Sequence, residues 1–138
     1  MNAHFTTRAH RLSLILLLVI GVTALAACGP KAPAVTEVQV TLNEYTITMD
    51  KTSIPAGPVK FVFNNTGSLT HEAVLEPAGA HDEPFSLDGK ESEAEEIEAG
   101  QSATLEWTID TPGDYQLACY IEGHFEQGMV TTFTVTAP

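Results

Sequence analysis

The sequence predicts an all-β protein, a Greek-key β-sandwich that follows a cleaved signal peptide. Short segments rich in β-branched and aromatic residues recur along the chain, and Gly, Pro, Asn and Asp separate them. Several of these segments alternate apolar and polar residues, which is the pattern of a strand with one buried face. Turn signals at this short spacing favour a sandwich, and the chain contains no internal repeat.

The first 27 residues are expected to be an export signal that is removed. Residues 1–11 carry Arg8 and Arg11 without any acid, and an almost wholly apolar run, Leu12–Leu25, follows. About 14 apolar residues are too few for a membrane-spanning helix, which needs about 20. Residues 25–28, Leu-Ala-Ala-Cys, resemble a bacterial lipobox, in which the signal is cut before the cysteine and the thiol receives a diacylglycerol. The alternative is an ordinary secretory signal.

Cleavage before Cys28 leaves a short tether and an acidic domain. Residues 28–36 form the lipid-anchored tether, whose eight Pro/Ala-rich residues after the cysteine extend at most about 28 Å. Residues 37–138 form the working domain. The chain has a formal charge of −12, and without Arg8 and Arg11 four Lys remain against 18 Asp or Glu, a charge of −14. We therefore expect a monomer that is lipid-anchored to a membrane, faces the periplasm or cell exterior and does not bind nucleic acid.

Six segments of the domain are predicted to be strands: Glu37–Met49, Val59–Asn64, His71–Glu76, Ala103–Ile109, Asp114–Cys119 and Met129–Thr136. Alternation places Tyr115, Leu117 and Cys119 on one face of their strand, which would be the inner face. The sequence Pro-Gly-Asp-Tyr115 at the start of that strand is also typical of the tyrosine corner of Greek-key sandwiches.

An acidic stretch interrupts the strand pattern. Residues 82–98 hold eight carboxylates against the single Lys90. One interpretation is a solvated loop or a short helix, the helical pattern being confined to Ser92–Ile97. The other is a docking surface for a cationic redox partner, with Glu93, Glu95 and Glu96 as its contacts. The two interpretations are compatible.

The residues that carry chemistry lie in one constellation. Cys119, His124 and Met129 have the spacing C-x4-H-x4-M, and His71 begins a strand 48 positions upstream of the cysteine. Gly123 and Gly128 would let the intervening loop turn back, so that His124 comes from the loop and Met129 from the start of the next strand. A thiolate, two imidazoles and a thioether are the ligands of a type 1 copper centre, with the thioether as the weak axial donor. The sequence therefore predicts one Cu(I)/Cu(II) ion.

These motifs resemble the cupredoxins, the small blue copper proteins that include plastocyanin, azurin, auracyanin and rusticyanin. Residues 64–71 look like the segment that bears the first histidine of the family, and residues 112–129 look like its ligand loop. The resemblance implies an eight-stranded Greek-key sandwich, equatorial ligands His71, Cys119 and His124, and axial Met129. Plastocyanin and azurin have Asn after the first histidine, where it ties the ligand loops together, whereas this chain has Glu72. That departure leaves the hydrogen bonds around the ligands open, and strand alternation places Glu72 on the opposite sheet face from His71.

The function expected from this site is one-electron transfer outside the cytoplasm, with no enzyme activity. The partners would be redox proteins such as a cytochrome or a membrane oxidase or reductase, docked through the acidic stretch or through the apolar rim around His124 and Phe125. A copper-resistance or copper-chaperone lipoprotein is the alternative, although only Met49 and Met129 remain in the mature chain. A binding module would leave the Cys/His/Met spacing unexplained, and a Cys–His nucleophilic enzyme would need a third orienting group. The absence of a His-x-His pair excludes a multicopper oxidase, and the single loop cysteine excludes a binuclear copper site.

Overall fold

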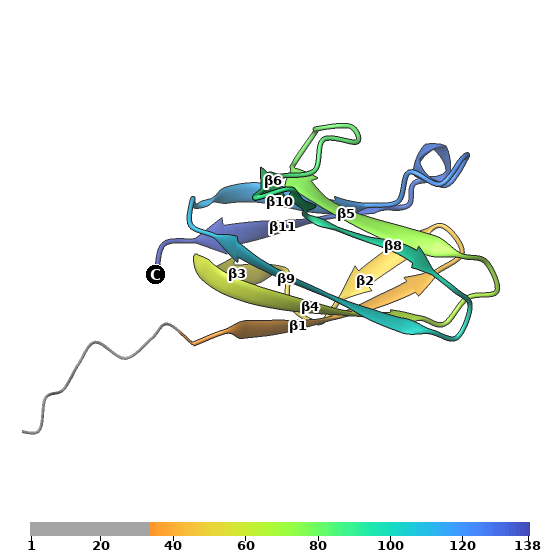
Figure 1. Cartoon of the computed structure of the whole chain (residues 1–138), viewed down its shortest axis with the longest axis horizontal. Helices are drawn as coiled ribbons and strands as arrows, with labels where there is room; N and C mark the ends of the chain where they lie inside the picture. Colours follow the sequence, from red (N-terminus) through yellow and green to blue (C-terminus); the bar gives the residue numbers. More distant parts are fainter. Residues whose placement is uncertain (1–33) are drawn as a thin grey trace, which may run out of the picture. The chain divides into compact units, whose positions relative to one another are not determined.

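The structure, a computed structural model, describes residues 34–138 as two facing β-sheets (Figure 1). The four-stranded sheet has the order β2-β1-β4-β9, with β1 at Thr36–Asn43, β2 at Thr46–Met49, β4 at Gly57–Asn65 and β9 at Ser102–Ile109. The five-stranded sheet has the order β3-β11-β10-β5-β8, with β3 at Ser53–Pro55, β11 at Val130–Thr136, β10 at Gly113–Ala118, β5 at His71–Pro77 and β8 at Glu93–Ile97. The predicted all-β sandwich is confirmed, with nine strands in its two sheets where the family resemblance implied eight.

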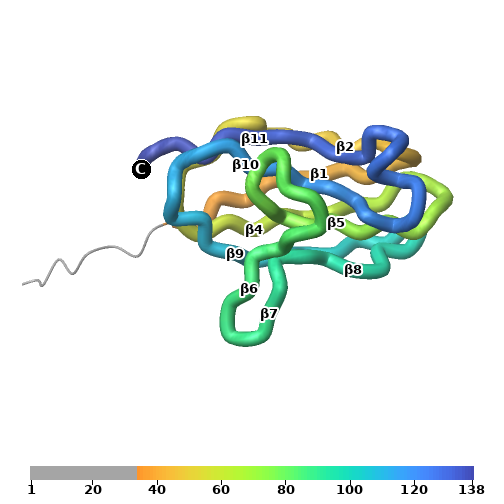
Figure 2. The backbone as a smooth tube through the Cα atoms, turned by 90° about the horizontal axis from the view of Figure 1, so that it is seen from above, coloured from red at the N-terminus to blue at the C-terminus, as the bar shows by residue number. Residues whose placement is uncertain are grey.

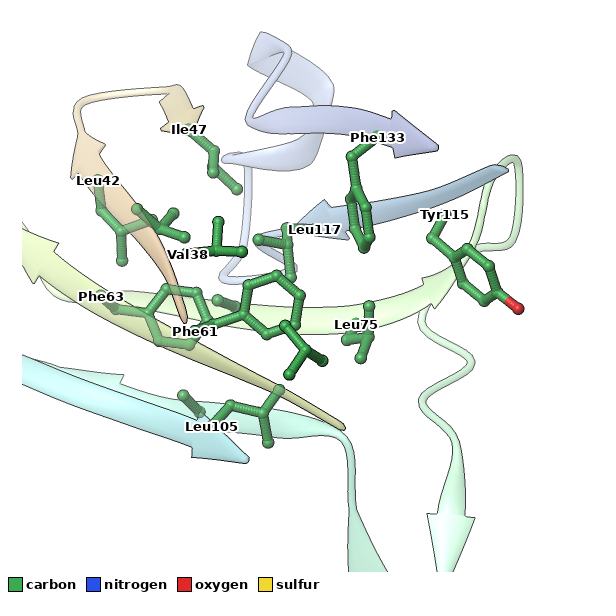
Figure 3. Packing of buried hydrophobic residues seen from close by; sticks show 14 of the residues in the cluster. Val38, Leu42, Ile47, Phe61, Phe63, Leu75, Leu105, Tyr115, Leu117 and Phe133 are labelled. Carbon is green, nitrogen blue, oxygen red and sulfur yellow. The ribbon is translucent and has the colours of Figure 1, made fainter. Parts of the chain in front are cut away.

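The core lies between the two sheets and comes from the alternating residues of their strands. Phe61 and Phe63 on β4 are fully buried, and Leu117 on β10 faces them from the other sheet (Figure 3). The predicted inner face of β10 is confirmed, because Tyr115, Leu117 and Cys119 all belong to this core. Burial of each large apolar side chain stabilises the fold by about 1.5–3 kcal/mol.

The tyrosine corner is present as predicted. The Tyr115 hydroxyl donates a hydrogen bond of 2.8 Å to the backbone carbonyl of Thr111, four residues upstream. Parallel pairing of β1 with β4 and of β3 with β11 shows that the chain crosses between the sheets, as a Greek-key path requires.

The segment Glu37–Met49, predicted as one strand, is two strands joined by a tight turn. Strands β1 and β2 pair as an antiparallel hairpin in which Asn43 faces Thr46. Tyr45 in this turn has a φ of 59°, a left-handed value that is uncommon outside glycine. Each strand alternates by itself, but the buried positions change from even numbers in β1 (Val40, Leu42) to an odd number in β2 (Ile47), and this phase shift marks the turn.

The acidic stretch is neither a plain loop nor a helix, which corrects the first interpretation. It contains a two-stranded hairpin, β6 (Ser86–Leu87) and β7 (Lys90–Glu91), which projects from the sandwich in Figure 2. Residues 93–97, where a helical pattern was noted, form edge strand β8 against β5. Ala94 and Ile97 are buried there, and the pairing backbone of β5 outweighs the weak local preference of a Glu-rich segment for helix.

The loops at one end of the sandwich carry the candidate site. Strand β1 runs along the whole sheet, so the β1–β2 turn lies far from the start of β1 and at the same end as residues 66–70 and the 3-10 turn η1 (Phe125–Gln127) in Figure 1. Within residues 34–138 no helix has the length and apolar character needed to cross a bilayer. The predicted signal peptide (1–27) and most of the predicted tether (28–36), including Cys28, lie outside the described residues.

Candidate metal centre

Cys119 follows β10 directly and is fully buried. Its backbone N–H donates a 3.0 Å hydrogen bond to the carbonyl of Met129, which continues the pairing of β10 with β11 by one more residue. The thiol therefore sits on rigid sheet backbone at the end of the core. This position confirms the sequence-based placement of Cys119 on the inner face.

The ten residues after Cys119 fold back and deliver two more donors. Gly123 and Gly128 have φ values of 84° and 94°, so each takes a left-handed conformation that costs a side-chain-bearing residue energy. The His124 carbonyl accepts a 3.1 Å hydrogen bond from the Met129 N–H, which closes the loop around η1. His124 is only 7% exposed and Met129 is fully buried. The predicted role of the two glycines is confirmed.

His71 comes from a different part of the chain and is the first residue of β5, as predicted. The preceding residues 66–70 are held by Asn65, a buried side chain whose amide N–H groups donate to the carbonyls of Leu69 (2.7 Å) and Ile97 (2.8 Å). The Asn65 side chain thus fixes the point at which the chain enters β5. His71 itself is fully buried.

The three side chains converge. His71 Nδ1 lies 3.3 Å from His124 Nδ1, and Cys119 Sγ lies 3.4 Å from the same nitrogen. All three donor atoms lie within 4.8 Å of one another, and residues 34–138 contain no other such group of three or more His, Cys, Asp or Glu. Donors that bind one first-row metal at about 2.0–2.3 Å stand about 3.5 Å apart in a trigonal plane, so the cluster fits a metal ion.

The chemistry of the donors also fits a metal. Burial lowers the pKa of His71, and the nearby His124 lowers it further, so the imidazole is neutral at physiological pH, as a ligand must be. Burial raises the pKa of the Cys119 thiol, although the backbone N–H groups of Glu72 and Ile121 oppose this shift, so a metal that binds here would displace the thiol proton. His71 Nε2 is buried and has no hydrogen-bond partner, so the polar contacts of this ring are all on the side of the cluster.

Glu72 resolves the question that the sequence left open. Its carboxylate accepts a 2.6 Å hydrogen bond from the backbone N–H of Tyr120, the residue after Cys119. The side chain is half-buried between two fully buried residues, His71 and Ala73, which agrees with its predicted place on the outer face. Glu72 therefore ties β5 to the Cys119 loop, which is the task that Asn performs in plastocyanin and azurin.

The proposed docking residues lie on two neighbouring surfaces. His124 and the half-buried Phe125 belong to the loop at the end of the sandwich. Glu93 is half-buried on β8, and Glu95 and Glu96 are exposed. Strand β8 pairs with β5, with Ile97 opposite His71, so the acidic strand lies directly beside the strand that supplies the first histidine.

Glu93 has an unusual charge state within this acidic strand. Burial, then the hydrogen bond to Glu91 and the repulsion from Glu95, Glu91 and Glu72, together raise its pKa to about 7. The ionised form of Glu93 is thus disfavoured in the folded protein. The raised pKa of Glu93 therefore makes a contribution to the free energy of unfolding that is fully present below about pH 4.5 and is lost as the pH rises through about 7.

We expect the Glu93→Gln variant to be more stable than the wild type at pH 8.5 and equally stable at pH 4. Glutamine cannot ionise, so it escapes repulsion from the neighbouring carboxylates at high pH. The gain should be about 1 kcal/mol, because solvent still reaches this half-buried side chain and screens its charge. Urea unfolding of the metal-free protein at both pH values measures the difference. An equal effect at both pH values would contradict the role given to the Glu93 charge.

Several residues near the site could not be predicted from their sequence position. The Tyr45 ring meets the His124 ring edge-on, with ring centroids 5.3 Å apart. Tyr120 and Phe125 stack at 4.9 Å, and His81 packs on both rings. Aromatic residues beside the ligands in sequence were a signal for Tyr120 and Phe125, but Tyr45 and His81 reach the site only through the fold.

Comparison with known proteins agrees with this geometry. The cupredoxin-like domain family matches residues 13–132. The copper-resistant cuproprotein CopI of Rubrivivax gelatinosus is 31% identical over 112 residues, which are 74% of this chain and 67% of CopI.

Two solved structures have the same fold at lower identity. Auracyanin B superposes with a TM-score of 0.62 at 24% identity and covers 77% of this chain and 91% of its own. Auracyanin A, a blue copper protein from Chloroflexus aurantiacus, superposes with a TM-score of 0.59 at 18% identity, over 75% of this chain and 100% of its own. With the Cys/His/Met cluster, these findings show that the chain belongs to the cupredoxin-like domain family and that its cofactor is copper.

Proposed function

We propose that the protein is a one-electron carrier in which His71, Cys119, His124 and Met129 would hold the copper ion. The observation that carries this proposal is the convergence of two imidazole nitrogens and a thiol, all buried, at one end of the sandwich. The bound ion would supply the Cu(I)/Cu(II) couple. The residues of the chain hold the donors, exclude water and keep the donor geometry fixed.

The surroundings of the cluster favour electron transfer over catalysis. All four proposed ligands are nearly or fully buried, so they leave no open position for a substrate. The Cys119–Met129 backbone hydrogen bond and the Glu72–Tyr120 hydrogen bond fix the ligand loop from two sides. A donor set that moves little when the charge of the metal changes lowers the barrier to electron exchange. We therefore propose a carrier and not an enzyme.

The direct test is a redox cycle. Copper-loaded residues 29–138 should show an intense visible band when oxidised, lose it on reduction and regain it on reoxidation through many cycles with no release of copper. Stopped-flow mixing of the reduced protein with an oxidised cytochrome should show growth of the α-band of the reduced cytochrome and growth of the blue band with the same rate constant. Release of copper during cycling would contradict the carrier role.

Copper handling is the second candidate, and similarity to the copper-resistant cuproprotein CopI favours it. A protein of that function would pass its ion to an acceptor. The two functions differ in the rate at which Cu(I) moves to a chelating acceptor peptide, because a handling protein exchanges copper readily and a carrier with buried ligands does not. Measurement of that exchange separates them.

We propose that the protein is exported and that Cys28 carries the lipid anchor. The described domain begins at the end of β1 that lies far from the metal cluster (Figure 1). A tether there would leave the opposite end of the sandwich, which carries the metal cluster and is called the copper end below, free to face other proteins. Mass spectrometry of the native protein should show an N-terminal peptide that begins at Cys28 and carries acyl chains. Cys28→Ser should release the protein from membranes, because a signal without its cysteine receives no acyl chains. An unmodified Cys28 in the native protein would contradict the anchor.

We further propose that the partner is a basic redox protein, such as a cytochrome or the exposed domain of a membrane oxidase, that docks beside the copper end. Strand β8, with Glu93, Glu95 and Glu96, lies next to β5 at that end. Its negative field would speed encounter with a positively charged partner.

Simultaneous replacement of Glu93, Glu95 and Glu96 by Gln should slow association with a cationic cytochrome about tenfold at low salt and flatten its salt dependence. The visible spectrum should not change, because none of the three is a proposed ligand. Stopped-flow rates across ionic strength, for the wild type and the variant, give this result. If the association rates of the wild type and the variant depended equally on salt, the result would contradict docking at β8 and favour docking at the apolar rim around His124 and Phe125.

A further inference from the structure

The β1–β2 turn contacts both histidine-bearing segments, although it supplies no ligand. Residues 43–46 form this turn, and Glu44 and Tyr45 occupy its tip. Asn43 Oδ1 accepts a 2.8 Å hydrogen bond from the Glu44 N–H, which fixes the backbone of the turn. Both tip side chains are half-buried against neighbouring loops at the copper end of the molecule.

The Glu44 carboxylate holds the segment that leads into His71. Oxygen Oε1 accepts hydrogen bonds from the backbone N–H groups of Ser68 (2.5 Å) and Leu69 (3.0 Å), and from the Ser68 hydroxyl (3.1 Å). Leu69 lies only two residues before His71. One side-chain oxygen thus collects three donors from the loop that positions the first proposed ligand.

The neighbouring backbone is shaped to admit this carboxylate. A Cβ atom at Gly67 would lie 2.6 Å from Glu44 Oε1, so a residue larger than glycine would displace the carboxylate or the loop. Thr66 adds a second connection between the same two segments, because its N–H and its hydroxyl both donate to the Leu42 carbonyl, at 2.9 and 3.1 Å. The Asn65 side-chain amide also holds this loop, because it donates a hydrogen bond to the Leu69 carbonyl.

The same turn also reaches the second histidine. The Tyr45 ring meets the His124 ring edge-on, at a centroid distance of 5.3 Å and an interplanar angle of 79°. Two adjacent residues of one turn therefore contact the segment before His71 and the ring of His124, although 53 positions separate the two histidines in the chain.

The turn also brings a charge to the site. The N–H of Ser68, more than any other group, lowers the pKa of Glu44 to about 2, so the carboxylate is ionised across the physiological pH range. The carboxylate is bound to the N–H of Leu69, two residues before His71, so its negative charge lies close to the proposed copper site. A fixed negative charge near a metal ion favours the more highly charged oxidation state.

We propose that Glu44 is a positioning residue that sets the reduction potential of the copper, holding the His71 segment through its hydrogen bonds and favouring Cu(II) through its charge. Tyr45 completes this brace by covering the His124 ring. The proposal rests on the copper ligation proposed above, and the three hydrogen bonds to one carboxylate oxygen carry it.

Two variants separate the two contributions of Glu44. Glu44→Gln keeps an acceptor oxygen and removes the charge, so the visible spectrum should stay unchanged while the potential rises. At a fixed ambient potential the Cu(II)/Cu(I) ratio should fall three- to tenfold, a shift of up to about 59 mV for a one-electron couple, and the shift should shrink at high salt. Glu44→Ala removes the hydrogen bonds as well and should also weaken copper binding about tenfold and alter the visible band.

The matched control is Glu106→Gln, a neutralisation at an exposed position on β9 that makes no contact with the copper end. It should leave the potential unchanged. Equal potentials, spectra and copper affinities for the wild type, Glu44→Gln and Glu44→Ala would overturn the proposal, as would equal shifts for Glu44→Gln and Glu106→Gln. Failure of the copper ligation itself is distinguishable, because the copper-loaded wild type would then show no intense visible band.

Discussion

Replacement of Cys119 by serine is expected to abolish the intense visible absorption of the copper-loaded protein. The band requires charge transfer from a thiolate to Cu(II), and a hydroxyl oxygen cannot supply that transition. The substitution keeps nearly the same volume at a fully buried position, so the fold should survive. Absorption spectra of both proteins after titration with one equivalent of Cu(II) measure the change. If the Cys119→Ser variant retained the band, the assignment of Cys119 as a copper ligand would be wrong.

The matched variant is Met129→Leu, which also conserves volume in the core. The blue band should remain, because the thiolate is intact, while the reduction potential should rise when the weak axial donor that supports Cu(II) is lost. Loss of colour in both variants would point to disruption of the loop and not to loss of a particular ligand. Circular dichroism of the metal-free variants controls for that outcome.

Most of the sandwich could be predicted because its strands bury one face. The alternation in β4, β9, β10 and β11 follows the core residues that the structure shows, and these strands lie within one or two residues of their predicted bounds. Strand β8 was missed because its stability comes from pairing with β5, and its Glu-rich sequence carries little of that information. The β1–β2 turn was missed because Glu44 and Tyr45 are not typical turn residues, and the fold imposes the left-handed backbone of Tyr45.

The candidate ligands were accessible from sequence for a different reason. Cys119, His124 and Met129 share one short loop, and the chemistry of their side chains is specific enough to suggest copper from their spacing. The residues that hold them were not accessible, because Glu44 and Ser68 are 24 positions apart and Glu72 and Tyr120 are 48 apart. Only the fold brings such partners together. Glu72 shows the consequence, since its hydrogen bond to the ligand loop could not be inferred from its identity.

Glu76 is the most deeply buried example of such a partner. Its side chain is fully buried near the end of β5, yet the carboxylate is satisfied by three donors: the Gln116 amide (2.8 Å), the backbone N–H of Glu83 (2.8 Å) and the Tyr120 hydroxyl. Burial and the hydrogen bond to Glu76 raise the pKa of Tyr120 to about 12, so the phenol remains a donor at any physiological pH. The network joins β5, β10, the segment before β6 and the residue next to Cys119.

Glu76→Leu should lower the free energy of unfolding of the metal-free protein by about 3 kcal/mol. The volume change is small, so the cost comes from buried donors that lose their acceptor. Urea unfolding without copper measures it, since bound copper would add stability of its own. Glu122→Leu, at an exposed position in the ligand loop, should change stability by less than about 0.5 kcal/mol.

A double-mutant cycle with Tyr120→Phe gives the sharper result. Tyr120→Phe should cost about 1–2 kcal/mol in the wild type, where it removes a donor from the buried carboxylate, and almost nothing in Glu76→Leu, where the hydroxyl has already lost its partner. Additive costs would show that Tyr120 and Glu76 stabilise the protein independently. If the two are coupled, Tyr120→Phe should also broaden the visible band of the copper-loaded protein, because the backbone of Tyr120 follows Cys119 directly and its N–H is already bound to Glu72. The buried carboxylate would then support the metal site as well as the fold.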